Sequence, residues 1–264
     1  MMRITDTVKH IIILNVIFWI GTIVIGQYGD VFTDLFAMHF PMNDSFKPWQ
    51  IFTHMFMHAS YVGMNGGASI FIFHILFNML GVWMFGSPLE QMWGRNKFLI
   101  FYFSCGLGAT ILPLAIDYYN FYTITSSLID SGKYTMDSIT GILNEGKFYV
   151  EWNTIVGEEK VSTLNSLFNG PSLGASGALM GLLVAFGMSF PNSSLMLIFL
   201  PIPIKAKYFI PLLLGYEIIS GFTGGSSMFG FNIGHWAHVG GALTGFLIFS
   251  YWKKTQFNKN RWDR

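Results

Sequence analysis

The sequence predicts an all-α membrane protein that crosses the bilayer several times. Hydrophobic residues make up 52% of the 264 residues and charged residues only 11%, against about 25% charged in a typical soluble domain. The mean hydropathy is +0.47, and apolar residues are gathered in six runs of nearly membrane-spanning length. Lysine and arginine are frequent in alternate connections between these runs, as expected when successive helices cross a membrane in opposite directions.

The six runs predict transmembrane helices at about residues 10–27, 68–86, 98–116, 173–190, 208–222 and 233–252, within one membrane domain of residues 1–264. The fifth run contains Pro211 and Glu217 and is shorter than the roughly 20 residues that cross a bilayer. We expect a short, weakly held helix there. The run 195–204 is broken by prolines, so we expect it to lie at the membrane interface.

Two connections are unusually long. Residues 28–67 are rich in aromatic residues and methionine, which predicts short helices lying in the membrane interface rather than a solvated loop. Residues 117–171 are mixed and charged, and they predict a polar extramembrane insertion.

The distribution of basic residues predicts the orientation. Eleven of the fifteen lysines and arginines fall in one alternate set of connections and are therefore expected on the inside. They are Arg3, Lys9, Arg95, Lys97, Lys205, Lys207, Lys253, Lys254, Lys259, Arg261 and Arg264. Both termini are then cytoplasmic, and the lack of a recognisable organelle-targeting signal favours a bacterial plasma membrane.

Ser176 and His238 are the candidate catalytic residues. Ser176 stands in Gly174-Ala175-Ser176-Gly177 at the start of the fourth run, and His238 stands near the start of the sixth. A histidine in a membrane helix is rare and usually functional. A serine hydroxyl becomes a good nucleophile when a base such as neutral imidazole takes its proton. We therefore interpret the two as a hydrolytic pair, although a serine between glycines also occurs simply as a packing residue.

The predicted topology brings Ser176, His238 and His74 to one depth. The second, fourth and sixth helices run from outside to inside, and each of these residues lies roughly 5 to 10 Å below the outer end of its helix, at about 1.5 Å per residue.

Small residues predict that the fourth and sixth helices touch. Gly177 and Gly181 are four apart on one helix, and Gly241 and Gly245 are four apart on the other. Such small-xxx-small stripes allow two backbones to approach closely.

His74 and Asn78 are candidate oxyanion donors. They are four residues apart and therefore share one face of the second helix. Peptide hydrolysis places negative charge on the carbonyl oxygen, and preorganised donors such as these side chains and the Ser176 amide would stabilise it. The alternative is that both side chains only bond one helix to another.

With these motifs the sequence resembles the rhomboid intramembrane serine proteases. The resemblance is carried by residues 174–177, the His74 and Asn78 pair, residues 237–245 around His238, and residues 90–98 after the second run. It implies a six-helix rhomboid-like bundle and a Ser-His dyad without an acid, in which Ser176 is the nucleophile, His238 is the base, and His74 and Asn78 are oxyanion donors. Gly174, Gly177, Met180 and Gly241 would support the site.

The resemblance also implies the substrate and the lack of a cofactor. The substrate would be a single-span or multi-span membrane protein, cut near the outer end of a transmembrane helix within the lipid bilayer, with no metal and no organic cofactor. The chain departs from the family at Met180, where many members have an aromatic residue, and at Gln50, where many have arginine. The 117–171 insertion is also longer than the usual link, and we hypothesise that it shapes access to the site.

Alternative functions rest on other residues. A pseudoprotease that binds or dislocates membrane helices usually lacks the serine or the histidine, and both are present here. His54 and His58 are four apart, but without a nearby carboxylate a hydrogen-bonding role is favoured over a metal site. Glu217 is an intramembrane acid that could serve ion movement in a transporter; we favour a hydrogen bond to a neighbouring helix. The net charge of +1 gives no indication of a nucleic-acid partner.

Overall fold

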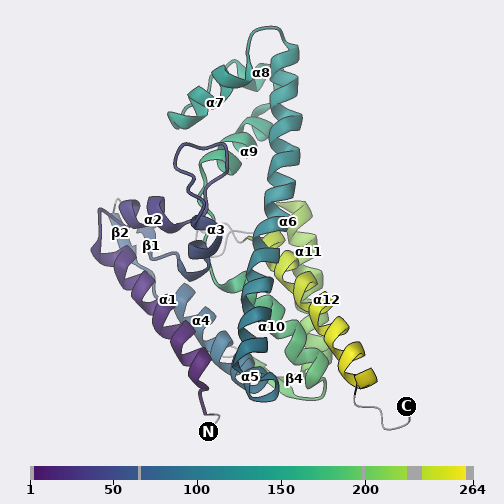
Figure 1. Cartoon of the computed structure of the whole chain (residues 1–264). Helices are drawn as coiled ribbons and strands as arrows, with labels where there is room; N and C mark the ends of the chain where they lie inside the picture. Colours follow the sequence, from purple (N-terminus) through teal and green to yellow (C-terminus); the bar gives the residue numbers. More distant parts are fainter. Residues whose placement is uncertain (1–2, 65–66, 198–199, 225–233, 260–264) are drawn as a thin grey trace.

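The computed structural model describes residues 3–64, 67–197, 200–224 and 234–259. The described chain is mainly helical, with two small hairpins (Figure 1). The first half contains α1 (Asp6–Val24), α2 (Asp30–Phe36), α3 (Gln50–Thr53), η1 (His54–Phe56), β1 (Tyr61–Met64), β2 (Gly67–Ile70), α4 (Phe73–Gly81), the π-helical η2 (Val82–Gly86), α5 (Ser87–Trp93) and α6 (Arg95–Asp130). The second half contains α7 (Met136–Asn144), α8 (Trp152–Val156), α9 (Glu158–Asn169), α10 (Ser176–Ser189), β3 (Ser194–Leu197), β4 (Leu200–Lys205), α11 (Ala206–Thr223) and α12 (His235–Lys259).

Helices α6, α10 and α12 form the centre of the bundle (Figure 1). Glycines explain how closely α10 and α12 approach. A Cβ on Gly241 would overlap the carbonyl oxygen of Gly177, and one on Gly245 would lie 2.7 Å from the Cα of Gly181. The close packing expected from the two glycine stripes is therefore confirmed, and it leaves no room for a larger residue at either position.

The helices α1, α4, α5 and α11 surround this centre. In Figure 1, α1 and α4 lie on one side of α6 and α10, and α11 lies on the other side next to α12. Helix α1 begins, and α12 ends, on the same lower side of the bundle (Figure 1). By length and composition, α1 and α6 could each cross a bilayer, while α10 is apolar but only 14 residues long. The number of six transmembrane helices stays a prediction.

The 117–171 insertion is helical. Helix α6 continues to Asp130, well beyond the expected end near residue 116, and α7, α8 and α9 follow. A hydrophobic core separate from that of the bundle holds this part together. Its buried residues are Phe40, Phe121, Ile124, Leu128, Ile139, Leu143, Trp152, Val161, Leu164 and Phe168. The upper half of α6 therefore serves as the support for a small helical subdomain (Figure 1).

One expectation about local structure was wrong in detail. The second helix begins at Phe73 rather than near residue 68, because Gly67–Ile70 pairs with Tyr61–Met64 as an antiparallel hairpin. Residues 194–205 form a second hairpin, β3 with β4. The short helices expected in residues 28–67 are present as α2, α3 and η1.

Candidate active site

Ser176 is the first residue of α10, and its position depends on Gly174. Gly174 has a φ of +130°, a conformation that side chains with a Cβ rarely adopt, so the chain can turn there into the helix. The amide of Gly174 donates to the carbonyl of His54, 3.0 Å away, which ties this turn to the η1 segment. At the first position of a helix the backbone N–H has no intrahelical acceptor, so the Ser176 amide can donate to a group outside the helix.

The Oγ of Ser176 lies 2.8 Å from Nε2 of His238. His238 is in the first turn of α12, and its side chain is only 13% exposed. The contact follows from the close approach of α10 and α12 at Gly177 and Gly241, which sets their N-terminal turns side by side. The expected contact between these two side chains is therefore present in the structure.

His74 faces the same space as Ser176. Its Nδ1 accepts a hydrogen bond of 2.9 Å from the Ala59 amide, so the ring carries its proton on Nε2. A Cβ built on Gly174 would lie 3.5 Å from the Ser176 Oγ and 3.8 Å from the His74 Nε2, which places both atoms around one point. His74 is thus oriented to donate toward a group held at Ser176.

Asn78, unlike His74, is hydrogen-bonded within its own helix. It is 5% exposed, and its Nδ2 donates to the carbonyl of His74 at 2.9 Å, within α4 itself. Its Oδ1 has no hydrogen-bond partner among the described residues. One N–H of the amide is free for a second acceptor. The oxyanion roles of His74 and Asn78 stay predictions.

Glu217 of α11 is also part of the site, which the sequence alone did not reveal. Its Oε2 is hydrogen-bonded to Nδ1 of His235 at 2.7 Å and lies 3.0 Å from Nδ1 of His238. The carboxylate therefore reaches the side of the candidate base that faces away from Ser176. The expected hydrogen bond between Glu217 and a neighbouring helix is present, and its partner is His235 on α12.

The rhomboid domain model matches residues 45–254, which include Ser176, His238, His74, Asn78 and Glu217. The chain belongs to the rhomboid family. It is 27% identical to presenilin-associated rhomboid-like protein A, mitochondrial, of Danio rerio over 191 residues, or 70% of this chain and 37% of that protein. It is 25% identical to rhomboid protein 1, mitochondrial, of Saccharomyces cerevisiae over 181 residues, covering 69% and 38%. Identity to the human presenilin-associated rhomboid-like protein, mitochondrial, is 26% over 181 residues, covering 68% and 34%.

These relatives correct the expected location of this rhomboid protein. The bacterial plasma membrane, with cytoplasmic termini, is contradicted because the curated relatives are named as mitochondrial proteins in animals and in yeast. The location that these names give, for the relatives themselves, is mitochondrial. The chain spans a little more than a third of the length of the relatives it matches.

His54 and His58 hold the connection between α1 and α4 in place through hydrogen bonds. Nδ1 of His54 is hydrogen-bonded to the carbonyl of Gln50 at 2.8 Å, and Nε2 of His58 to Oδ1 of Asn15 at 2.8 Å. Burial lowers the pKa of His54, and burial followed by repulsion from His74 lowers the pKa of His58 to about 3. Both rings are therefore neutral at pH 7. Their contacts confirm the favoured hydrogen-bonding role.

Many family members have arginine at the position of Gln50 in this chain. The side-chain amide of Gln50 uses both its donor and its acceptor groups in hydrogen bonds. Its side chain is buried, and Nε2 donates to the carbonyls of Asp34 and Ser45 at 2.8 and 3.0 Å. Its Oε1 accepts from the amides of Lys47 and His39 at 3.1 and 3.3 Å. One neutral side chain thus joins four points of the loop. Met180, the other departure from the family, is buried in the main core.

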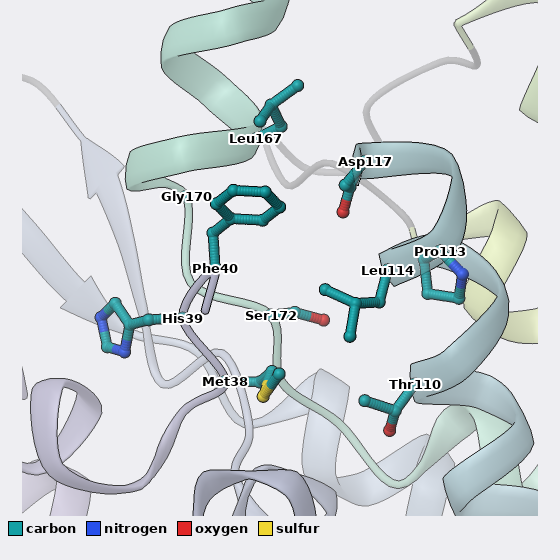
Figure 2. A pocket seen from close by; sticks show the side chains of 10 residues that line it. All are labelled: Met38, His39, Phe40, Thr110, Pro113, Leu114, Asp117, Leu167, Gly170 and Ser172. Atoms are coloured by element: carbon teal, nitrogen blue, oxygen red, sulfur yellow. The ribbon is translucent and has the colours of Figure 1, made fainter. Parts of the chain in front are cut away.

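A cavity lies between α6, the loop at Met38 and the segment that leads to Ser176 (Figure 2). Its volume is about 50 Å³, enough for a few water molecules. Two backbone hydrogen bonds of 2.8 Å join Met38 to Ser172 beside it. The lining residues are Met38, His39, Phe40, Thr110, Pro113, Leu114, Asp117, Leu167, Gly170 and Ser172. Ser176 and His238 are not among them, so this cavity belongs to the base of the insertion rather than to the dyad.

Proposed function

We propose that this protein is an intramembrane serine endopeptidase in which Ser176 and His238 are the catalytic residues. The single observation that carries the proposal is the 2.8 Å contact between the Ser176 Oγ and the His238 Nε2. Rhomboid proteins are generally intramembrane serine proteases, and membership of that family supports the same reaction.

The reaction follows from this contact. His238 Nε2 takes the hydroxyl proton while Ser176 Oγ attacks the scissile carbonyl carbon. The negative oxygen that forms is stabilised by Nε2–H of His74, by the Ser176 amide and by Asn78. His238 then returns the proton to the leaving amine, and water activated by the same imidazole hydrolyses the acyl-enzyme. No metal or organic cofactor takes part in these steps.

The proposed substrates are single-span or multi-span membrane proteins of the same bilayer. Ser176 and His238 stand in the first turns of α10 and α12, so the cut is expected near the outer end of a substrate helix.

The chain acts as one membrane domain, and the helical insertion at residues 117–171 shapes access to the site. Deleting the insertion should change cleavage of at least one substrate, and unchanged cleavage of all substrates tested would refute its role in access.

A fluorophosphonate probe tests the proposal. The purified protein in detergent is expected to react covalently, whereas the variants Ser176→Ala and His238→Ala are expected to lose at least about 10³-fold in labelling rate. Mass spectrometry of a membrane-helix reporter, cleaved in liposomes, would locate the cut, with Ser176→Ala as the control. A folded wild-type protein that neither labels nor cleaves would favour the alternative of a pseudoprotease that binds or dislocates membrane helices.

A further inference from the structure

We propose that Glu217 completes a Ser176–His238–Glu217 triad, in which it is a positioning residue for the base. The inference rests on the proposed peptidase function and deepens it, because the family resemblance implies a dyad without an acid. The sequence places Glu217 and His238 on different helices, 21 positions apart. Only the packing of α11 against α12 brings the carboxylate to the imidazole.

The tautomer of His238 decides whether this residue can act as a base. To take a proton from Ser176, Nε2 must be unprotonated, and the neutral ring then carries its proton on Nδ1. Glu217 Oε2 lies 3.0 Å from that Nδ1. The carboxylate favours a proton there, and it would repel the lone pair that the opposite tautomer places on Nδ1. Glu217 therefore selects the tautomer in which His238 can act as a base.

A positive charge forms on His238 during the reaction. When Ser176 gives up its proton, His238 becomes an imidazolium, and the carboxylate 3.0 Å away stabilises this positive charge. The proton moves from Oγ to Nε2, and Glu217 gains no proton. Because Glu217 and His238 are 5% and 13% exposed, little water screens the interaction.

A second histidine, His235, holds the Glu217 carboxylate in place. His235, 7% exposed, is hydrogen-bonded through Nδ1 to the same Oε2 at 2.7 Å. His235 and His238 are three residues apart on α12 and so present their rings to one face. The Nδ1 of His238 has no aligned hydrogen bond among the described residues. Since catalytic hydrogen bonds often tighten only when substrate binds, the present contact is a resting form of the triad.

Other uses of this carboxylate are less consistent with the geometry. Within the described part of the chain, no group of three or more histidine, cysteine, aspartate or glutamate side chains is arranged to hold a metal ion. A carboxylate that merely clamped α11 to α12 would need only its bond to His235. The contact with His238 is what distinguishes a positioning role from a clamp.

The test compares Glu217→Gln with the wild type. The amide has the same shape but no charge, so the rate of fluorophosphonate labelling and the kcat for a reporter helix should each fall about 100-fold, with KM changed less than about twofold. Glu217→Asp should recover part of the rate. The control is Ser220→Ala, a buried residue one turn along α11, which should keep the wild-type rate. A Glu217→Gln protein that labels and cleaves at the wild-type rate would overturn the triad.

A second measurement avoids dependence on the variant's folding. Nitrogen NMR of the wild type, with His238→Ala to assign the signal, should show His238 protonated at Nδ1 and unprotonated at Nε2. The opposite tautomer would overturn the proposal. A wild-type protein without any labelling would contradict the peptidase function itself, whereas normal wild-type activity with an insensitive Glu217→Gln would contradict the triad alone.

Discussion

A single proton on His74 determines what this residue can do beside Ser176. Because its Nδ1 is occupied by the Ala59 amide, the ring can only donate through Nε2 toward the space next to Gly174. Asn78, one turn further along α4, uses one N–H to bond the carbonyl of His74. The two candidate donors therefore differ: His74 is free to donate into the site, and Asn78 also fixes the helix that carries it.

This difference predicts the effect of His74→Ala. Loss of an oxyanion donor should lower kcat by about 10²- to 10³-fold, with a small change in KM. The measurement is reporter cleavage by the purified variant in liposomes. His10→Ala, which removes an exposed histidine of α1 that is hydrogen-bonded to the Asp6 carbonyl of its own helix, should retain full activity. Normal kcat in His74→Ala would exclude a role in stabilising the oxyanion.

Among the helices, α1 begins on a carboxylate supplied by α5. Glu90 accepts hydrogen bonds from the amides of Thr7 and Val8, each 3.1 Å long, and another from the Thr5 hydroxyl. Burial alone would raise the pKa of Glu90, but these hydrogen bonds outweigh it and hold the pKa below the usual 4.5. The negative charge also lies at the positive end of the α1 dipole. Glu90 therefore caps a helix more than 80 residues earlier in the chain.

Replacing Glu90 with glutamine should weaken this cap in a pH-dependent way. A carboxyl with a lowered pKa contributes stability that is present above its ordinary pKa and is lost as the pH falls through the lowered value. We expect Glu90→Gln to lose about 1–3 kcal/mol at pH 7, and the loss should shrink below about pH 4. Thermal unfolding in detergent at the two pH values measures it, with the exposed Glu145→Gln as control. An equal loss at both pH values would contradict the prediction.

For the molecule as a whole, Phe40 joins the insertion to the rest of the fold. It is 4% exposed, and its ring lies 4.8 Å from Tyr118, 5.1 Å from Phe121 and 5.8 Å from Phe168 between centroids. Tyr118 and Phe121 belong to α6 and Phe168 to α9, so one ring from the first loop fills the core of the subdomain.

Truncating this ring should loosen the insertion from the bundle. Phe40→Ala leaves a cavity in a packed core and is expected to cost about 3–5 kcal/mol. We expect a lower unfolding temperature and faster proteolysis within residues 131–151. Tyr119→Ala, at a side chain that is 71% exposed on α6, should change neither. If Phe40→Ala resisted protease as well as the wild type, the loop would not be holding the insertion.

Properties that are local in the chain could be predicted without the structure. Hydropathy reports how each residue partitions into lipid, and spacing reports which residues share a helix face. These two facts sufficed for the helical bundle, the glycine stripes of α10 and α12, and the meeting of Ser176 with His238. The contact of Glu217 with His238 was missed because hydropathy marks a buried acid without identifying its partner.

Apart from the meeting of Ser176 with His238, the contacts between distant segments were settled only by tertiary packing. Glu217 reaches His235 and His238 because α11 lies against α12 with one particular rotation, which depends on side chains from several helices at once. The cap that Glu90 forms on α1 and the position of Phe40 under the insertion have the same origin. A residue's type and spacing specify what it can bind, but which partner it binds depends on how separate helices fit together in space.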